Sequence, residues 1–320
     1  MQIIHGTTEF ELPHKSAIAI GKFDGIHLGH RKLIDNILEQ KNNGCLAVVF
    51  TFNPSPAVFF SGKEAKELMT VHEKRAAFER MGIDVLIEFP LNEETAATQP
   101  EHFVTEYLIK KLKASVIVAG TDISFGDKGA GNAELLCEMS PGGGYFAQII
   151  DKVTFEGNEI SSTHIREAVS RGDMEKVTAL LGTPYSINGT VVCGRKLGRK
   201  LGMPTVNLQP SNEKLLPPNG VYCSYAWVDG IRYPAISNVG VKPTVNDEPI
   251  VGVETYIYDF DKNVYGSEIS VELLYFKRAE MKFDSIEALK EQMQKDIDEG
   301  MIFHHSFDKK QRKEKDGYES

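Results

Sequence analysis

The segment Ala17-Ile-Ala-Ile-Gly-Lys-Phe-Asp-Gly-Ile-His-Leu-Gly-His30 decides the fold of the first half of the chain. A short apolar run leads directly into a glycine-rich turn, and a helical pattern begins as soon as the turn ends. A turn of this kind between a first parallel strand and a helix presents backbone N–H groups and the helix dipole to anions. The segment therefore predicts a binding turn for nucleotide phosphates.

Two histidines, His27 and His30, lie in this turn and are separated by Leu-Gly. Imidazole N–H groups can donate hydrogen bonds to a triphosphate whose charge shifts as a nucleotidyl group moves, and Gly29 permits close approach of the backbone. This is electrostatic catalysis, which needs no nucleophilic side chain. A lone histidine is more often a packed or exposed residue, so the prediction depends on the pair and its context.

The chain beyond the turn alternates between apolar β-rich runs and helical patterns as far as residue 120. Such alternation is typical of an α/β domain with a parallel sheet and helices on its faces. Thr98-Gln-Pro-Glu101 has the spacing of a capping box and predicts a helix start. The expected strands are 17–20, 46–52, 85–89 and 116–119, and the expected helices are near 30–42, 71–81, 101–113, 163–171 and 174–181.

From Tyr185 the pattern changes to short β-rich runs that are separated by turn residues. Regular short strands of this kind predict an antiparallel barrel or sandwich. Asp284-Ser-Ile-Glu287 has capping-box spacing and predicts a final helix that ends near Glu299. With Gly182-Thr-Pro184 as a helix stop, we expect domains at 1–184 and 185–305 and a basic, flexible tail at 306–320.

Composition narrows the class of protein. The chain has 320 residues and a net charge of −9, from 36 Lys and Arg against 45 Asp and Glu, which argues against a nucleic-acid partner. No apolar run approaches the roughly 18 residues of a membrane span, and the first residues lack a secretory leader. The spacing of the cysteines fits neither a zinc ribbon nor a disulfide framework. We therefore expect a soluble, cytoplasmic protein with small-molecule partners and no membrane partner.

A second constellation occupies residues 189–207, where basic residues lie in a glycine-spaced loop. Such a loop can fold over phosphate oxygens, and it is not a Walker loop because the required Gly-Lys-Ser/Thr ending is missing. Thr205 and Asn207 follow on one face of an extended segment. Their oxygens suit Mg²⁺ that accompanies ATP. A basic hairpin with turn-forming Pro and Asn is the plainer interpretation.

The first constellation resembles the Gly-x-Phe-Asp-Gly-x-His-x-Gly-His motif of the HxGH nucleotidyltransferases, specifically the FMN adenylyltransferase (FAD synthetase) half of bacterial bifunctional riboflavin kinases/FAD synthetases. Residues 51–56, 119–126 and 160–166 follow the same family order. The resemblance implies a Rossmann-like α/β domain in which the histidines and Arg166 act on ATP. The implied ATP-binding residues are Gly21, Phe23, Asp24, Gly25, His27, His30, Asp122, Ser161, Ser162, Thr163 and Arg166.

This first segment also departs from the family pattern. The family usually has Asn at the position of Lys22, His at that of Ser55, Phe-Arg at that of Ile123-Ser124, and Arg at that of His164. Replacing a permanently charged arginine by a titratable histidine changes the charge available to phosphates. We therefore expect FAD formation that is reduced or sensitive to pH.

The second constellation is similar to the riboflavin kinase module, with its Gly-Arg-x-Leu-Gly-x-Pro-Thr-Ala-Asn motif, and only Val206 departs there. The likeness implies a β-barrel with a C-terminal helix. It also implies that Thr205 and Asn207 hold Mg²⁺ and ATP, and that Glu254 is the base for the riboflavin 5′-hydroxyl. The implied ATP-binding residues are Gly194, Lys196, Gly198, Gly202, Pro204, Thr205 and Asn207, and the implied flavin-binding residues are Glu254, Arg278 and Phe283.

Together the two likenesses imply an enzyme that converts riboflavin to FMN and FMN to FAD, with ATP as co-substrate and Mg²⁺ as cofactor. Two alternatives stay open. One is a kinase whose adenylyltransferase domain is weak or inactive. The other is a regulator that binds flavin without turnover, which the acidic composition and the retained Thr205, Asn207 and Glu254 oppose.

Overall fold

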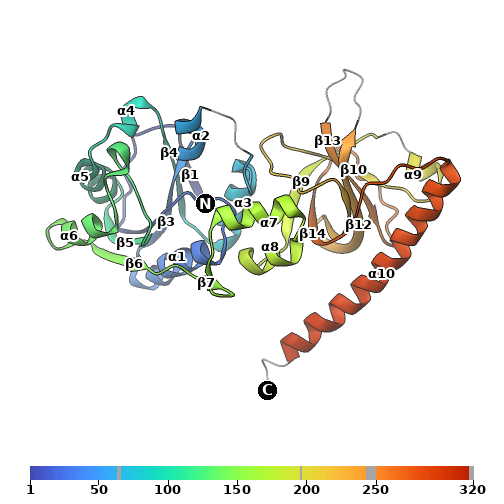
Figure 1. Ribbon diagram of the computed structural model, residues 1–320. Helices are drawn as coiled ribbons and strands as arrows, with labels where there is room; N and C mark the ends of the chain where they lie inside the picture. The colour runs from blue at the N-terminus through green and yellow to red at the C-terminus, as the bar shows by residue number, and fades with distance from the viewer. Residues whose placement is uncertain (63–65, 195–196, 243–249, 317–320) are drawn as a thin grey trace. The chain divides into compact units, whose positions relative to one another are not determined.

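The computed structural model describes residues 1–62, 66–194, 197–242 and 250–316. The chain forms two compact units, Met1–Ser162 and Thr163–Ser320 (Figure 1). Within the described ranges, no helix is long and apolar enough to cross a membrane.

The first unit is built on a six-stranded parallel sheet with the order β1-β4-β3-β2-β5-β6, as the sequence predicts for its central strands. The first strand, β1, was not predicted, because its four residues carry no apolar alternation. The strands are β1 (Gln2–His5), β2 (Ser16–Ile20), β3 (Leu46–Asn53), β4 (Val85–Pro90), β5 (Ala114–Gly120) and β6 (Phe146–Ile150).

Helices cover both faces of this sheet. The regular helices are α1 (Leu28–Glu39), α2 (Pro56–Ser61), α3 (Val71–Met81), α4 (Glu93–Ala96), α5 (Pro100–His102) and α6 (Ala133–Gly143). Phe103–Lys111 continues α5 as a π-helix, short 3₁₀ turns lie at Gln40–Asn43 and Asp127–Gly129, and a small hairpin joins β7 (Thr154–Phe155) to β8 (Asn158–Glu159).

Strand β2 shows how the sequence sorts side chains onto the two faces. All five of its residues are buried, and side chains alternate between faces along a strand. Ala17 and Ala19 lie in the core under α1, whereas Ile18 and Ile20 lie in the opposite core under the π-helix. The small alanine side chains leave room for α1 to pack closely on this face. The turn that connects β2 to α1 lies at the carboxyl end of β2.

The capping box predicted at Thr98 is wrong. Helix α5 has Gln99 as its N-cap, and no side chain caps it. The capping box forms one helix earlier, where Asn92 and Thr95 exchange hydrogen bonds at the start of α4. The Thr98 N–H donates to the Thr95 carbonyl at 3.3 Å, so Thr98 belongs to the end of α4.

The second unit contains the predicted antiparallel barrel. It is closed, with the strand order β10-β13-β12-β11-β14-β9, and helix α8 packs against β14 and β9. The strands are β9 (Tyr185–Val192), β10 (Val206–Pro210), β11 (Gly220–Val228), β12 (Ile231–Lys242), β13 (Ile250–Ile257) and β14 (Glu268–Ala279), and the helices are α7 (Ser162–Arg171), α8 (Met174–Leu181), α9 (Leu197–Lys200) and α10 (Ile286–Asp316).

Two predictions about the last helix are wrong. Its N-cap is Ser285, whose Oγ accepts from the Ala288 N–H at 3.1 Å, and not Asp284. The helix does not end near Glu299 but continues to Asp316, so the segment expected to be flexible from residue 306 is helical up to there (Figure 1). The reason is packing, because Phe303 stacks on Tyr275 of the barrel with ring centroids 5.6 Å apart.

Candidate functional sites

The turn after β2 is anchored by one aromatic side chain. Phe23 is fully buried, and its ring makes an edge contact with Phe78 of α3 at 5.6 Å and lies 5.0 Å from the His30 ring. Phe23 and Ile26 both have positive φ, at 50° and 44°, a conformation that non-glycine residues rarely adopt. Burial of Phe23 thus holds a strained turn whose shape presents the following histidines.

His27 and His30 form a stacked pair at the start of α1. Their ring centroids are 3.7 Å apart with an interplanar angle of 17°. The His27 Nδ1 accepts a hydrogen bond from the His30 backbone N–H at 3.3 Å, which makes His27 the N-cap of the helix. Gly29 lets the backbone pass close to this ring, because a Cβ there would lie in tight contact with the His27 ring atoms, at 3.1 Å.

Burial keeps both imidazoles neutral at pH 7. It lowers the pKa of His27 to about 4, and the negative charges of Asp24 and Asp122 oppose this only partly. Burial, and then the neighbouring His27, also lower the pKa of His30. Since His27 Nδ1 accepts a hydrogen bond, its proton resides on Nε2, and this N–H can donate to a ligand. The buried Nδ1 of His30 has no hydrogen-bond partner within the described part of the chain.

Two more segments of the first unit reach this turn. The Ser162 Oγ donates to the Asp24 carbonyl at 2.9 Å, and the Leu68 N–H donates to the Asp24 carboxylate at 2.9 Å. Asp122 follows β5 at the same edge of the sheet, where its exposed carboxylate lies 3.7 Å from Lys152. The structure therefore gathers Gly21, Phe23, Asp24, Gly25, His27, His30, Asp122 and Ser162 at the carboxyl ends of the strands.

The remaining predicted residues of this site lie around the start of α7. Ser161 directly precedes the helix, and Thr163 and Arg166 occupy its first two turns, which belong to the second unit. Arg166 is half-buried and His164 is exposed.

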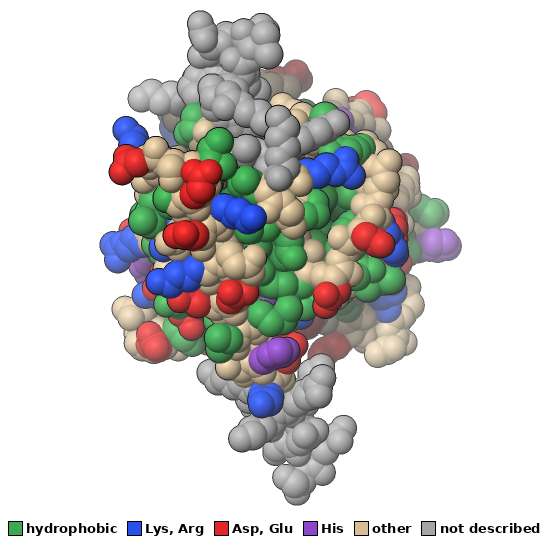
Figure 2. Space-filling view, turned by 90° about the vertical axis from the view of Figure 1, so that its right-hand side faces the viewer, with side chains coloured by type: hydrophobic (Ala, Val, Ile, Leu, Met, Phe, Trp, Pro, Cys, Tyr) green, Lys and Arg blue, Asp and Glu red, His purple; other side chains and the backbone are tan. Residues whose placement is uncertain are grey.

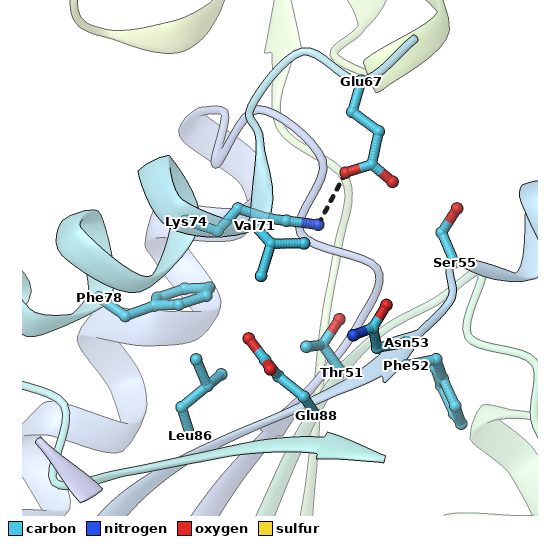
Figure 3. A pocket seen from close by; sticks show the side chains of 10 residues that line it. All are labelled: Thr51, Phe52, Asn53, Ser55, Glu67, Val71, Lys74, Phe78, Leu86 and Glu88. Carbon is cyan, nitrogen blue, oxygen red and sulfur yellow. Dashed lines mark hydrogen bonds and ion pairs between the residues drawn. The ribbon is translucent and has the colours of Figure 1, made fainter. Parts of the chain in front are cut away.

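A small pocket beside the turn, between β3, β4 and α3, was missed by the sequence analysis (Figure 3). Its charges are paired, because Lys74 contacts Glu67 at 3.0 Å and Glu88 accepts from Arg75 Nε at 2.8 Å. Thr51 donates to the Lys22 carbonyl at 3.3 Å and links the pocket to the turn. Residues 51–56 follow the family order, but the sequence gave no signal that Lys74 and Glu88 lie beside them. We interpret the pocket as support for the turn.

The second constellation folds around Thr205 and Asn207 at the start of β10. Both residues line a cavity of about 480 Å³, together with Gly202 and Pro204. A Cβ on Gly194 would lie 2.6 Å from the Asn207 amide, and one on Gly198 would lie 2.4 Å from the Met203 carbonyl oxygen. The glycine-spaced loop therefore packs its backbone directly on these side chains. Lys196, also predicted for this site, lies outside the described residues.

The far wall of this cavity was not assigned from the sequence. It is formed by the connection between β13 and β14. The residues of this wall that line the cavity are Phe260, Asp261, Lys262, Asn263, Val264 and Tyr265.

Strand register places the predicted base next to the predicted metal ligand. Asn207 of β10 is the direct cross-strand partner of Glu254 of β13, and Glu254 is the partner of Asn238 of β12. Directly opposed residues have Cβ atoms about 4.5–5.5 Å apart and point to the same face. We call Asn207, Glu254 and Asn238 the polar row. Pairing continues it through Val221 of β11 to Arg278 of β14.

The predicted flavin residues Arg278 and Phe283 lie close together in sequence, at the end of β14 and in the connection from β14 to α10. Arg278 donates to the buried Asp296 of α10, from Nε to Oδ1 at 3.1 Å and from Nη2 to Oδ2 at 2.5 Å. This bidentate pair fixes the guanidinium. Phe283 lies half-buried in the connection from β14 to α10.

The donors at Thr205 and Asn207 fit a magnesium ion only together with a nucleotide. No group of three or more His, Cys, Asp or Glu side chains in the described ranges can hold a metal by itself. A hydroxyl and an amide oxygen are hard but neutral ligands, and Mg²⁺ commonly completes its shell with substrate phosphates and water.

Comparison with known families matches both halves of the chain. Residues 9–164 match the family model of FAD synthetase, and residues 181–303 match that of riboflavin kinase. Among curated proteins, the bifunctional riboflavin kinase/FMN adenylyltransferase of Listeria monocytogenes is 34% identical, with 93% of this chain and 95% of the relative covered. The protein of the same name from Bacillus subtilis is 37% identical, with 90% and 92% covered.

A solved structure has the same fold along most of the chain. It is a Streptococcus pneumoniae protein described as a macrolide-efflux protein, with a TM-score of 0.83 and 29% sequence identity. The match covers 92% of this chain and 97% of the Streptococcus chain.

The buried histidine pair predicts a pH effect that can be measured without a ligand. We expect the His27 imidazole to titrate near pH 4 in the folded protein. An unfolded chain binds this proton near pH 6.5, so the free energy of unfolding of the first unit decreases as the pH falls from about 6.5 to 4. NMR titration of the imidazole resonances, assigned with a His27→Asn variant, measures the midpoint. Titration of His27 near pH 6.5 would contradict the buried, neutral pair.

Proposed function

Because this chain belongs to the family of bifunctional riboflavin kinases/FMN adenylyltransferases, we propose that it catalyses two successive reactions that consume ATP. In the first, the 5′-hydroxyl of riboflavin attacks the γ-phosphorus of ATP, which yields FMN and ADP. In the second, the phosphate of FMN attacks the α-phosphorus of another ATP, which yields FAD and pyrophosphate. The observation that carries this proposal is that each unit holds its own phosphate-binding constellation and matches its own family model.

The first unit suits adenylyl transfer. A neutral histidine pair at a helix N-terminus can donate N–H groups to the phosphates of ATP and stabilise the charge that develops at the α-phosphorus. The unpartnered Nδ1 of His30 supports a role for the pair beyond packing. We assign ATP binding to Gly21, Phe23, Asp24, Gly25, His27, His30, Asp122, Ser161, Ser162, Thr163 and Arg166.

The departures from the family pattern bear on how well this step runs. Lys22 and His164 are both exposed, and Lys22 contributes its backbone carbonyl to the hydrogen bond with Thr51. The stacked pair of His27 and His30 forms in this chain alongside these departures, which supports an active adenylyltransferase over a kinase alone. We propose that His164, as a titratable group in place of arginine, makes FAD formation sensitive to pH.

The second unit suits phosphoryl transfer to an alcohol. We assign ATP binding to the cavity at Thr205 and Asn207, and we assign Gly194, Lys196, Gly198, Gly202 and Pro204 to the same ATP site. Mg²⁺, when bound there with ATP, would neutralise phosphate charge. We assign Glu254 as the acceptor of the 5′-hydroxyl proton, and its pairing with Asn207 in the polar row supports this assignment. Arg278 and Phe283 are assigned to the flavin side.

We assign the adenylyltransferase to residues 1–184 and the kinase to residues 185–305. We also propose that both bind small-molecule partners. On the face shown in Figure 2, acidic and basic side chains are interspersed and form no basic stripe, as suits small-molecule partners there. We place the enzyme in the cytoplasm. Its four cysteines are all free thiols, as suits a reducing compartment.

The assignment is tested by incubating the purified chain with riboflavin, ATP and Mg²⁺ and separating the flavins by chromatography. We expect FMN to appear first and FAD to follow. FMN that accumulates without FAD would support the kinase-only alternative, and bound but unchanged riboflavin would support the regulator.

Replacing the proposed base should separate the two activities. General-base assistance is worth about 10²–10⁴ in rate, so Glu254→Gln is expected to slow FMN formation by that factor. FAD formation from supplied FMN should stay unchanged and serves as the control for folding. A near-normal kinase rate in this variant would reject Glu254 as the base.

The reciprocal variant tests the histidine pair. His30→Ala is expected to abolish FAD formation from FMN and to spare FMN formation, because His30 lies in the first unit and the residues assigned to the kinase step lie in the second. His30→Asn, which fills more of the same space, guards against a loss that reflects misfolding and should also be inactive. If both activities fell together in the two variants, the division of labour between the units would be wrong.

A further inference from the structure

The third member of the polar row, Asn238, is held in a fixed orientation by a carboxylate. Its Nδ2 donates to Glu280 Oε1 at 3.4 Å, and Asn219 Nδ2 donates to Glu280 Oε2 at 3.3 Å. The two amides thus bind opposite oxygens of one carboxylate. Glu280 follows β14 and Asn219 precedes β11, so the cluster joins three segments of the barrel.

This contact settles which end of the Asn238 amide faces Glu280. An ionised carboxylate only accepts hydrogen bonds, so the NH₂ group must face it. The carbonyl oxygen of Asn238 is therefore left on the other side of the amide as a hydrogen-bond acceptor. Asn238 is half-buried and lies directly across from Glu254.

Gly240 makes the approach of Glu280 possible. A Cβ at this position would lie 2.1 Å from Glu280 Oε1 and 3.2 Å from Asn238 Nδ2. The carboxylate therefore packs directly on the Gly240 backbone, and any side chain there would displace it. Three separate features, the register, the two amides and the bare backbone, fix one orientation of Asn238.

We propose that Asn238 is a substrate-positioning residue of the kinase step, and that its carbonyl oxygen accepts a hydrogen bond from the 4′-hydroxyl of the ribityl chain. This inference rests on the proposed function. Glu254 takes the proton of the 5′-hydroxyl, and Asn238 is its neighbour on the adjacent strand. Two side chains side by side match two hydroxyls on adjacent carbons of one polyol.

Glu280 acts through Asn238 and is a positioning residue, since it keeps the acceptor end of the amide turned to the substrate. The arrangement selects a polyol chain over a simple alkyl alcohol, because a substrate without the 4′-hydroxyl leaves the Asn238 oxygen unpaired.

The test compares riboflavin with 4′-deoxyriboflavin as substrates of the full chain. A hydrogen bond between neutral groups contributes about 0.5–1.5 kcal/mol, which corresponds to roughly 2- to 12-fold in KM. We expect Asn238→Ala to raise KM for riboflavin by that factor, with a smaller change in kcat. On 4′-deoxyriboflavin, the variant and the original chain should have the same KM, because the bond is already missing. Gln209→Ala, on the outer face of β10 but outside the row, is the matched control and should change neither KM.

Variants of Glu280 provide a second test. A purely structural role of Glu280 would change KM equally for riboflavin and for the deoxy substrate. Glu280→Ala frees the amide to rotate and is expected to raise KM for riboflavin but not for the deoxy substrate. Glu280→Gln keeps an acceptor for the Asn238 NH₂ group and should restore KM toward that of the original chain.

The outcomes separate the inference from the function on which it rests. If the original chain makes no FMN, the proposed function and this inference both fail. If FMN forms and Asn238→Ala has the original KM for riboflavin, or raises KM equally for both substrates, only the inference is overturned.

Discussion

Close approach of backbone to side chain is the constraint on which both sites depend. At Gly29 the backbone lies against the His27 ring, and at Gly194 it lies against the Asn207 amide. A methyl group at Gly194 would overlap the Asn207 amide, and one at Gly29 would press tightly against the His27 ring. Because glycine has no side chain, the backbone can contact the His27 ring and the Asn207 amide without displacing them. The same close packing thus occurs in both units, although one is built on a parallel sheet and the other on a closed antiparallel barrel.

The two sites also manage charge differently, although both receive the same anionic co-substrate. In the first unit, burial removes charge from the histidines, and the pair offers N–H dipoles in place of a cation. In the second unit, the oxygens of Thr205 and Asn207 are neutral, so compensation of phosphate charge there would depend on a cation such as Mg²⁺. A chain with a net charge of −9 thus needs few fixed positive charges at its sites.

Much of this architecture could be predicted from the sequence, because local patterns determine it. Alternation in β2 and the turn after it locate the first site, and the glycine-spaced loop locates the second. The polar row could not be found in this way, since it depends on which residues of β10, β12 and β13 are opposed. The end of α10 was missed because Phe303 is recognisable as a packing residue only when Tyr275 is seen beside it. The cap at Ser285 was displaced by one position, which spacing alone does not resolve.

Closure of the barrel has a consequence for the order in which the molecule is made. Strand β9 (Tyr185–Val192), the first strand of the barrel, pairs with β14 (Glu268–Ala279), the last strand to be synthesised. The parallel sheet of the first unit has all its strands once the ribosome has passed Ile150. Distant pairing is slow to form, and domains near the N-terminus fold first during synthesis. We therefore expect the parallel sheet of the first unit to fold during synthesis before β14 is available to close the barrel.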